Sequence, residues 1–118
     1  MELTHGHLRY LAAVLELSAT HTSVSSAQVA ALLGVSRPSV ARMLGVLAER
    51  NLIAKERYGK VILTPAGEAA ARRYQERVES LLGRLEELGL SLSREEALCA
   101  AGALAAVLPA RCFPEQEE

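Results

Sequence analysis

Residues 25–47 read SSAQVAALLGVSRPSVARMLGVL, and this stretch decides the fold. It predicts two short helices joined by a tight turn, because Gly34 interrupts the helical pattern and supplies the permissive backbone that a sharp turn needs. Ser36 is suited to cap the second helix, and Pro38 stands in its first turn, where the missing N–H costs nothing. The first helix has an apolar face formed by Val29, Leu32 and Leu33. The stretch is therefore typical of a helix-turn-helix.

The second helix of this pair has two contrasting faces, because successive residues turn by about 100°. The apolar positions that would face the core are Val40, Met43, Leu44 and Leu47. The positions that point the opposite way are Pro38, Ala41, Arg42, Gly45 and Glu49. Small residues beside an arginine allow a helix to lie close against base edges. The sequence thus predicts a recognition helix that enters a groove of DNA.

Upstream of this pair, residues 4–18 predict a helix and residues 19–25 a polar loop. The helix has a broad apolar face, formed by Leu8, Leu11, Ala12 and Leu15 together with Tyr10, Val14 and Leu17. A face of this width is mostly buried. Ser25 or Ser26 would cap the next helix, and Ser26 and Gln28 at its N-terminus could hold a DNA phosphate. Ordinary helix capping is the alternative for these side chains.

Residues 52–64, LIAKERYGKVILT, predict two short strands around Tyr58-Gly59. The apolar side of this hairpin consists of Ile53, Val61 and Leu63. The basic residues near its tip are Lys55, Arg57 and Lys60. A hairpin directly after a recognition helix is typical of a winged helix, whose basic tip, here with Tyr58, reaches phosphates or the minor groove. The alternative is a solvated hairpin whose charges only keep the protein soluble.

The C-terminal part predicts two helices that pack on partner helices. Residues 64–88 begin with Thr64 as N-cap and Pro65 in the first turn, and Gly89 ends the helix. Its coiled-coil-like seam consists of Tyr74, Val78, Leu81, Leu85 and Leu88. A capping box at 93–96 opens a last helix without a polar face, which must be covered to avoid aggregation. In so short a chain we expect a second copy to cover it, so that the seam residues of the long helix and Leu98, Leu104 and Leu108 of the last helix form the dimer interface.

These elements predict a mainly α fold with a small β-hairpin, a winged helix-turn-helix followed by a helical dimerisation arm. Residues 1–64 would form the DNA-binding domain, residues 65–109 the dimerisation region, and residues 110–118 a flexible acidic tail. In a homodimer the two recognition helices would stand about one helical turn of DNA apart, ~34 Å, and would match a palindromic operator.

The composition agrees with a helical protein that has a divided surface. Half of the 118 residues are hydrophobic and only 3% are aromatic, so the core is built from Leu, Ala and Val. The net charge of −1 conceals an asymmetry. Residues 34–77 carry nine Lys and Arg against four Glu, whereas residues 78–118 carry three Arg against eight Glu. The basic part coincides with the helix-turn-helix and the wing, as DNA binding requires.

Other classes of protein have little support in the sequence. The N-terminus has no signal-like segment and no apolar run is long enough to span a bilayer, so we expect a cytoplasmic protein without a membrane partner. Two cysteines do not make a disulfide framework. No G-x-S-x-G, phosphate-binding loop or H-E-x-x-H motif occurs, so we do not expect an enzyme.

Three stretches resemble the DtxR/MntR family of metal-dependent transcriptional repressors. They are HLRYLAAVLEL at 7–17, VAALLGVSRPSVARMLGVLAERNLI at 29–53 and YGKVILTPAGEAAARR at 58–73. The pieces LTPAG and VSRPSV also occur in other winged-helix regulators, such as those of the MarR type. The resemblance implies a homodimer that represses genes of metal uptake. It also implies DNA contacts from Ser36, Arg37, Pro38, Ser39 and Arg42.

The resemblance further implies a site for a divalent metal such as Mn, Fe or Zn, with ligands from the first helix, the long helix and the helix after it. The matching positions of this chain hold Arg9, Ala12, Val78 and Leu82, and the last helix offers only Cys99. Arginine and aliphatic side chains do not coordinate a divalent cation, and about three or four ligands are the usual minimum. The sequence therefore predicts that the inherited metal site has been lost.

Other side chains could ligate a metal elsewhere, namely His5, His7, His21 and Cys112. The alternative is that these histidines are exposed and solvated. We expect Cys99, on an apolar helix, to be a buried and inert thiol, because burial raises a thiol pKa. Cys112 lies beside Arg111 on the tail and is the better candidate for redox chemistry, and the alternative is that it is an incidental thiol.

The leading hypothesis is a homodimeric repressor on a palindromic operator. Arg37 and Arg42 would contact base edges or phosphates, Ser36 and Ser39 would bond phosphate oxygens, and the basic wing would contact the DNA backbone. The alternatives are a MarR-like regulator that responds to redox or to a ligand, and a winged-helix module that binds proteins. A sensor that binds a metal at the histidines, or a small molecule between the arm and the DNA-binding half, is a further alternative. Salt-sensitive retention on heparin or random duplex DNA separates the DNA-binding hypotheses from the protein-binding one.

Overall fold

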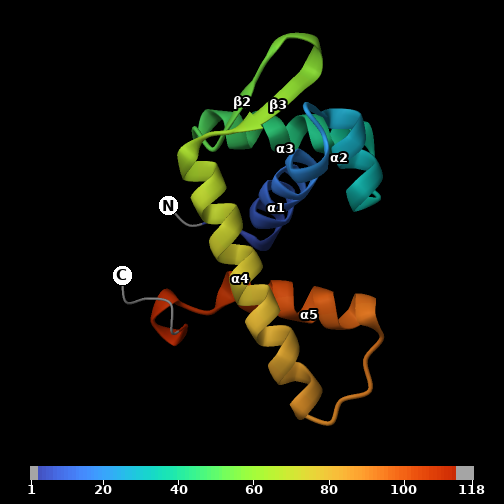
Figure 1. The fold of residues 1–118 in the computed structure, drawn as a ribbon, viewed down its shortest axis with the longest axis vertical. Helices are drawn as coiled ribbons and strands as arrows, with labels where there is room; N and C mark the ends of the chain where they lie inside the picture. The colour runs from blue at the N-terminus through green and yellow to red at the C-terminus, as the bar shows by residue number, and fades with distance from the viewer. Residues whose placement is uncertain (1–2, 114–118) are drawn as a thin grey trace.

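Five α-helices and a three-stranded antiparallel sheet form residues 3–113, the part of the chain that the computed structural model describes (Figure 1). The helices are α1 (His5–Thr20), α2 (Ser26–Leu33), α3 (Arg37–Glu49), α4 (Pro65–Glu87) and α5 (Arg94–Val107). The strands are β1 (Val24–Ser25), β2 (Ile53–Lys55) and β3 (Lys60–Leu63), and short 3-10 turns occupy Arg57–Gly59 and Ala110–Cys112. The mainly helical winged-helix fold predicted from the sequence is confirmed.

The molecule has two parts, and α4 connects them (Figure 1). The N-terminal half, residues 3–64, holds α1–α3 and the sheet; the arm, residues 65–113, holds α4 and α5. Helix α1 lies at the centre and contacts α2, α3, α4, α5 and the strands β1 and β3. The largest fully buried side chains all belong to the N-terminal half: Leu11, Val14, Val29, Val40 and Leu47. The main hydrophobic core therefore lies under the helix-turn-helix, with α1 as its base.

The sheet contains one strand more than the expected hairpin. Its order is β1-β3-β2, and β3 pairs with β2 at Ile53↔Leu63 and with β1 at Val24↔Val61. The prediction of a polar loop over residues 19–25 was therefore wrong in two respects, since α1 continues to Thr20 and Val24–Ser25 is a strand. A two-residue strand shows no alternating pattern in the sequence, but burial of Val24, which is 2% exposed, holds it in the sheet.

The junction between the wing and α4 is a close backbone contact. The N–H of Thr64 donates to the carbonyl of Leu52 over 3.1 Å, and the Thr64 hydroxyl donates to the carbonyl of Asn51 over 2.7 Å. The same hydroxyl accepts the N–H of Gly67 at 3.1 Å, so Thr64 is the N-cap, as predicted. A Cβ at Gly67 would overlap the carbonyl of Leu52. These contacts define the angle at which α4 leaves the N-terminal half.

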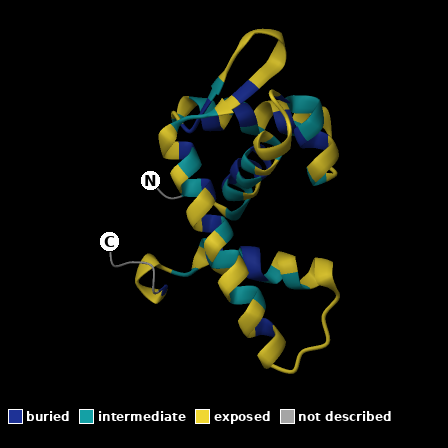
Figure 2. Ribbon diagram, viewed as in Figure 1, coloured by how far each residue is buried: buried dark blue, intermediate teal, exposed yellow. Residues whose placement is uncertain are grey.

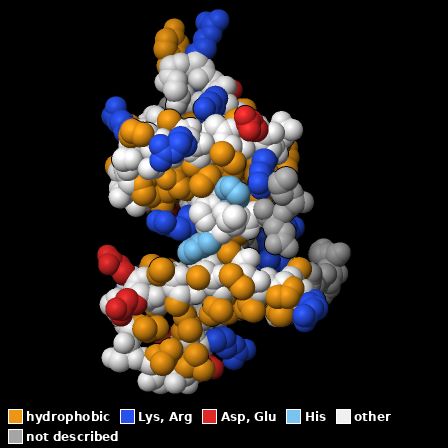
Figure 3. Space-filling view, turned by 180° about the vertical axis from the view of Figure 1, so that it is seen from behind, with side chains coloured by type: hydrophobic (Ala, Val, Ile, Leu, Met, Phe, Trp, Pro, Cys, Tyr) orange, Lys and Arg blue, Asp and Glu red, His pale blue; other side chains and the backbone are white. Residues whose placement is uncertain are grey.

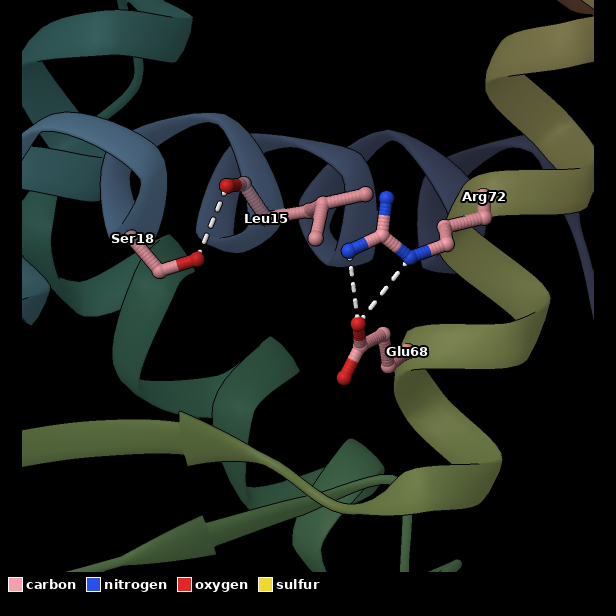
Figure 4. A network of polar contacts seen from close by, with 4 residues as sticks. All are labelled: Leu15, Ser18, Glu68 and Arg72. Carbon is pink, nitrogen blue, oxygen red and sulfur yellow. Dashed lines mark hydrogen bonds and ion pairs between the residues drawn. The ribbon is translucent and has the colours of Figure 1, made fainter.

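Further along, α4 packs against α1, and charged side chains cover the edge of this contact. The guanidinium of Arg72 donates from Nε and Nη2 to one oxygen of Glu68, over 2.9 and 2.7 Å. Figure 4 shows this pair extending from α4 toward Leu15 of α1, where the Ser18 hydroxyl donates to the Leu15 carbonyl over 2.8 Å. Both partners are half-exposed, so the pair contributes at most about 0.5 kcal/mol.

The end of the described chain is packed rather than loose. The ring of Phe113 is 5% exposed, and the guanidinium carbon of Arg77 lies 4.4 Å from its centroid. The expectation of a flexible tail was therefore wrong for residues 110–113, because the ring of Phe113 is buried and stacks with the guanidinium of Arg77 on α4. Residues 114–118 lie outside the described residues.

Two expectations about single helix faces were also wrong. Leu32 is 42% exposed rather than part of the core, and Ala30 is buried in its place. The side chain of Cys99 is exposed, because α5 buries only the narrow face of Ala101, Gly102 and Ala105 against α1 and α4. With small residues on its inner face, α5 leaves Leu104 and Val107 exposed. Figure 2 shows exposed residues along this helix.

Among the described residues no single helix has both the length and the apolar composition of a membrane span. Helices α2 and α3 reach these values only as a pair bent by 114°, and this pair is the helix-turn-helix whose apolar face forms the core.

Candidate DNA-binding interface

The N-terminus of α3 is built as the sequence suggests. Ser36 is the N-cap, and its Oγ accepts the N–H of Ser39 at 3.2 Å. The Ser36 hydroxyl also donates to the Ser39 hydroxyl over 3.0 Å, and the guanidinium of Arg42 donates to Ser39 Oγ over 3.4 Å. Arg42 thus lies along the outer surface of the helix toward its N-terminus. Gly34, with φ 67°, makes the turn that brings this end of α3 out of the domain.

The two faces of α3 are oriented as predicted. Val40, Leu44 and Leu47 are at most 2% exposed, and Met43 is half-buried beside them. On the opposite face, the exposed residues are Arg37, Pro38, Ala41, Arg42 and Glu49, with Gly45 half-buried. The outer face is therefore free of the protein's own core, and it carries two guanidinium groups among small side chains. Such a surface can approach base edges closely while the arginines donate hydrogen bonds.

The wing projects beyond this face as a short basic hairpin (Figure 1). Lys55, Arg57 and Lys60 are exposed, and the N–H of Glu56 donates to the carbonyl of Lys60 over 2.7 Å to close the tip. Tyr58 is 90% exposed and has a left-handed backbone, φ 63° and ψ 29°. Non-glycine residues rarely adopt this conformation. A tight turn with such a residue at its apex holds the aromatic ring out in solvent.

At the N-terminus of α2, the structure favours the capping interpretation. The N-cap is Ser25 rather than Ser26. The N–H of Ser25 donates to the amide oxygen of Gln28 over 2.9 Å, and Ser25 Oγ accepts the N–H of Gln28 at 3.2 Å. The amide oxygen of Gln28 is thus engaged in a capping box, and only its NH₂ group is left to meet a phosphate. Ser26 is half-buried and makes no hydrogen bond through its hydroxyl within residues 3–113.

The candidate metal ligands are not brought together. His7 is buried, not solvated, and its Nδ1 accepts the N–H of Thr4 at 3.0 Å in a capping box. His21 ends α1 at the other extremity of the helix, where its Nδ1 lies 3.1 Å from the carbonyl of Leu17. Cys112 is exposed in the last 3-10 turn. Among residues 3–113, no three His, Cys, Asp or Glu side chains are grouped to hold a metal ion.

His5 differs from the expected solvated histidine as well. Its ring lies 6.3 Å from that of Tyr74, centroid to centroid, and it approaches Gly102 of α5. Burial and, to a lesser degree, the charge of Arg9 lower the pKa of His5. Burial and then the charge of Arg50 lower the pKa of His7. The two histidines at the start of α1 are thus structural groups that favour the neutral form.

Sequence reasoning missed a cleft of about 700 Å³ between the N-terminal half and the arm. It is lined by α1, the end of α2, α4 and the start of α5, and Figure 3 shows the surface hollowed between the two parts. We call it the central cleft. The four positions matched to ligands of the DtxR/MntR family, Arg9, Ala12, Val78 and Leu82, line it together with Cys99 of α5. The helical spacing of these residues indicates that those on one helix share a face. No sequence pattern shows that the faces of three separate helices meet at one cleft.

The residues of the central cleft do not fit the family's metal. Arg9 brings a positive charge, and Val78 and Leu82 bring hydrocarbon, so Cys99 is the sole ligand type among the matched positions. Glu16 and Glu79 also line the cleft, yet they form no metal-binding group with a third ligand among the described residues. That the inherited metal site has been lost stays a prediction from the chemistry of these side chains.

Comparisons with known proteins found one matching family and several solved structures with a similar fold. Residues 2–61 match the family described as iron dependent repressor, N-terminal DNA binding domain. The manganese regulator SloR aligns with TM-score 0.77 and 24% identity over 93% of this chain and 50% of its own. IdeR of T. acidophilum aligns with TM-score 0.68 and 23% identity, over 88% and 48%. ZitR of Lactococcus lactis aligns with TM-score 0.64 and 25% identity, over 90% and 72%.

The chain spans about half the length of SloR and IdeR, and no curated protein sequence matches it significantly. The family match covers the helix-turn-helix and most of the wing, and it confirms the DtxR/MntR resemblance. The family is one of repressors and not of enzymes. The chain is therefore a DNA-binding transcriptional regulator that belongs to the iron-dependent repressor family.

Proposed function

We propose that this chain is a homodimeric, cytoplasmic repressor that binds a palindromic operator. The observation that carries the proposal is the free outer face of α3, where Arg37 and Arg42 stand exposed opposite a fully buried apolar face. Arg42 reads base edges, Ser36 and Ser39 bond phosphate oxygens, and Pro38 and Ala41 allow the close approach. Ser26 and the NH₂ group of Gln28 flank a further phosphate at the start of α2.

The wing supplies the part of the affinity that does not depend on sequence. Lys55, Arg57 and Lys60 neutralise phosphates beside the groove that α3 occupies. Tyr58, held out by its left-handed backbone, packs its ring against the sugar edges of the minor groove. Because the net charge of residues 34–77 is positive while that of residues 78–118 is negative, the molecule presents this side to DNA and the arm away from it.

A second copy of the chain covers the arm in this proposal. Outside the central cleft, large hydrophobic side chains are exposed along the end of α4, the following loop and α5: Leu88, Leu90, Leu92, Leu104 and Val107. Figure 3 shows hydrophobic side chains spread over this half. Monomers rarely expose so continuous an apolar surface. A two-fold axis through the arms presents two α3 helices to one face of DNA, which a palindromic operator requires.

Metal control is not part of the proposal. Family members such as SloR, a manganese regulator by description, act with metals, but the matched positions here hold Arg, Ala, Val and Leu. We expect that the operator affinity is the same with EDTA as with added Mn, Fe or Zn ions. An increase of about tenfold or more on metal addition would contradict this part of the proposal.

The experiment is a DNA-binding titration followed by selection of bound sequences from random duplexes. We expect binding that weakens linearly in log affinity against log salt, and enrichment of a palindrome. Arg42→Ala should lose about 1–3 kcal/mol on the selected site and relax its sequence preference, whereas Lys60→Ala should weaken all duplexes and reduce the salt slope by about one.

Arg84→Ala is the matched control, because Arg84 is an exposed arginine of the arm that pairs with Glu87 over 3.5 Å. It should leave DNA binding unchanged. Equal affinity of the wild type and Arg42→Ala for the selected site would overturn the assignment of α3. Absence of salt-dependent binding to any duplex would favour the protein-binding alternative instead.

A further inference from the structure

The central cleft has a lining that suits a small organic ligand. Its volume of about 700 Å³ lies within the range of about 300–1,000 Å³ that is usual for small-molecule pockets. Hydrocarbon walls come from both parts of the molecule, from Ala12 and Leu32 on one side and from Val78, Leu82 and Leu98 on the other. The exposed Leu32 and Leu98 thus face the same space. A ligand here would have an apolar body in contact with both halves.

The lining of the cleft also includes a hydroxyl donor and a positive charge, from Tyr74 and Arg9. The Tyr74 residue is 8% exposed, and its hydroxyl oxygen stays accessible, since no fully buried side-chain oxygen or nitrogen within residues 3–113 lacks a partner. The hydroxyl forms no hydrogen bond within these residues. His5 lies beside it, and both rings reach Gly102, where a Cβ would stand 2.5 Å from the Tyr74 hydroxyl and 2.8 Å from His5 Nε2. Burial raises the pKa of Tyr74, and Arg9 is close enough to oppose that rise. A hydroxyl that has no partner among the described residues and lies near an arginine is suited to an anionic oxygen.

The guanidinium of Arg9 is available for such a ligand. Arg9 is exposed and makes no ion pair with any residue of the described chain. Two carboxylates also line the cleft, but each is displaced along its helix from the residues proposed to hold the ligand. Glu16 follows Arg9 by seven residues on α1, which is about 10 Å along the helix axis. Glu79 follows Tyr74 by more than one turn on α4. These carboxylates repel a second negative charge at the outer end, although Arg94 of α5 also lines that part.

We propose that the central cleft binds a monocarboxylate with an apolar body, its carboxylate on Arg9 and the Tyr74 hydroxyl and its hydrocarbon between Leu32, Val78 and Leu98. The ligand thus occupies the region where the resemblance would put a metal ion, with Arg9 supplying the positive charge on the protein side. Since the ligand contacts both α1 and α5, its binding fixes the arm relative to the N-terminal half. The regulatory consequence, a change in operator affinity, rests on the proposed function.

The test is calorimetric titration of the full chain, without DNA, with octanoate and with 3-phenylpropionate. Octanamide is the uncharged control of matched shape. We expect saturable binding of one molecule per chain, with the amide weaker by about tenfold or more, because a charge-assisted hydrogen bond is lost. Arg9→Gln should bring octanoate to the affinity of octanamide, and Tyr74→Phe should weaken octanoate by several-fold.

Arg84→Gln, an exposed arginine of the arm outside the cleft, should bind octanoate as the wild type does. Thermal unfolding of each variant verifies that it folds. No saturable binding, equal affinities for acid and amide, or full affinity in Arg9→Gln would each overturn the proposal. So would Mn²⁺ or Zn²⁺ binding that Val78→Trp removes. A chain that binds octanoate but no DNA would contradict only the proposed function, and one that binds DNA but no carboxylate would contradict only the cleft.

Discussion

The N-terminal half and the arm bury their side chains in different ways. In the N-terminal half, large residues such as Leu11 and Leu47 are completely buried, and the basic residues lie outside them. In the arm, the buried face of α5 consists of Ala101, Gly102 and Ala105, while Leu104 and Val107 remain exposed. The first region therefore has the core that stabilises a domain by itself. The arm has its large apolar side chains on the outside, as is typical of a region that packs against another molecule.

This difference is tested most strongly by removing one large side chain from each part. Leu47→Ala should lower the free energy of unfolding by about 2–5 kcal/mol, because a fully buried leucine leaves a cavity. Leu104→Ala, at a position 37% exposed, should cost less than about 1 kcal/mol in dilute protein. Urea unfolding followed by circular dichroism measures both. Equal losses would mean that the arm shares the core of the N-terminal half.

The junction of the two parts gives a second test, with two glycines of the same helix. Gly67→Ala places a methyl group against the backbone of Leu52, so α4 must shift and we expect a loss of about 2 kcal/mol or more in unfolding free energy. Gly83→Ala, further along α4, meets no atom within 4 Å and should stabilise the helix by about 0.5–1 kcal/mol. Thermal unfolding shows whether each substitution lowers or raises the stability of the protein. A neutral Gly67→Ala would show that α4 is not held at that angle.

The expected function of the arm leads to a third test. Val107 is 76% exposed in the arm, and Val46 is 38% exposed on α3. Val107→Glu should raise the dimer dissociation constant by about tenfold or more, because a carboxylate would be buried between two copies. Val46→Glu should leave the oligomeric state unchanged. Sedimentation equilibrium distinguishes the two, and a particle that is monomeric in the wild type at all concentrations would refute the dimer.

The same contrast explains what the sequence could predict. In residues 25–47, apolar spacing, a turn glycine and a serine cap all indicate one structure, so the helix-turn-helix and its outward arginines follow from local rules. The strand Val24–Ser25 was missed because two residues have no period, and only pairing with β3 defines them. The exposure of Cys99 was missed because the sequence of a helix that is apolar on all sides does not show which of its faces packs against the rest of the protein.

The central cleft could not be predicted from local sequence patterns, for a related reason. Its walls come from α1, α2, α4 and α5, and their convergence depends on the angle that Gly67 and Thr64 impose on α4. The sequence did show that Arg9 and Val78 cannot be metal ligands. It could not show that these residues face one another across a cavity, because that is a property of helix packing and not of spacing.

The smallest expected effect concerns the start of α1, which anchors the N-terminal half above the arm. Neutral His7 accepts the N–H of Thr4, and burial together with Arg50 lowers its pKa from 6.5. As the pH falls below about 6.5, the unfolded chain binds a proton that folded His7 does not, so stability present above that pH is lost until the folded pKa is reached. Thermal unfolding between pH 7.5 and pH 5.5 should therefore show a falling midpoint.

The chain itself provides the control for this pH effect. Gln28 of α2 and Glu96 of α5 occupy the same third helical position as His7, and each accepts the N–H of its N-cap residue at 2.9 Å. His7→Gln should therefore keep the capping bond, because glutamine offers the same acceptor without a titrating group. The variant should match the wild type at pH 7.5 to within about 0.5 kcal/mol and lose less stability at pH 5.5. His5, whose pKa burial also lowers, accounts for the loss that remains. An unchanged pH profile in His7→Gln would mean that the acid sensitivity of the fold comes from His5, which lies beside α5, and not from the capping box at the start of α1.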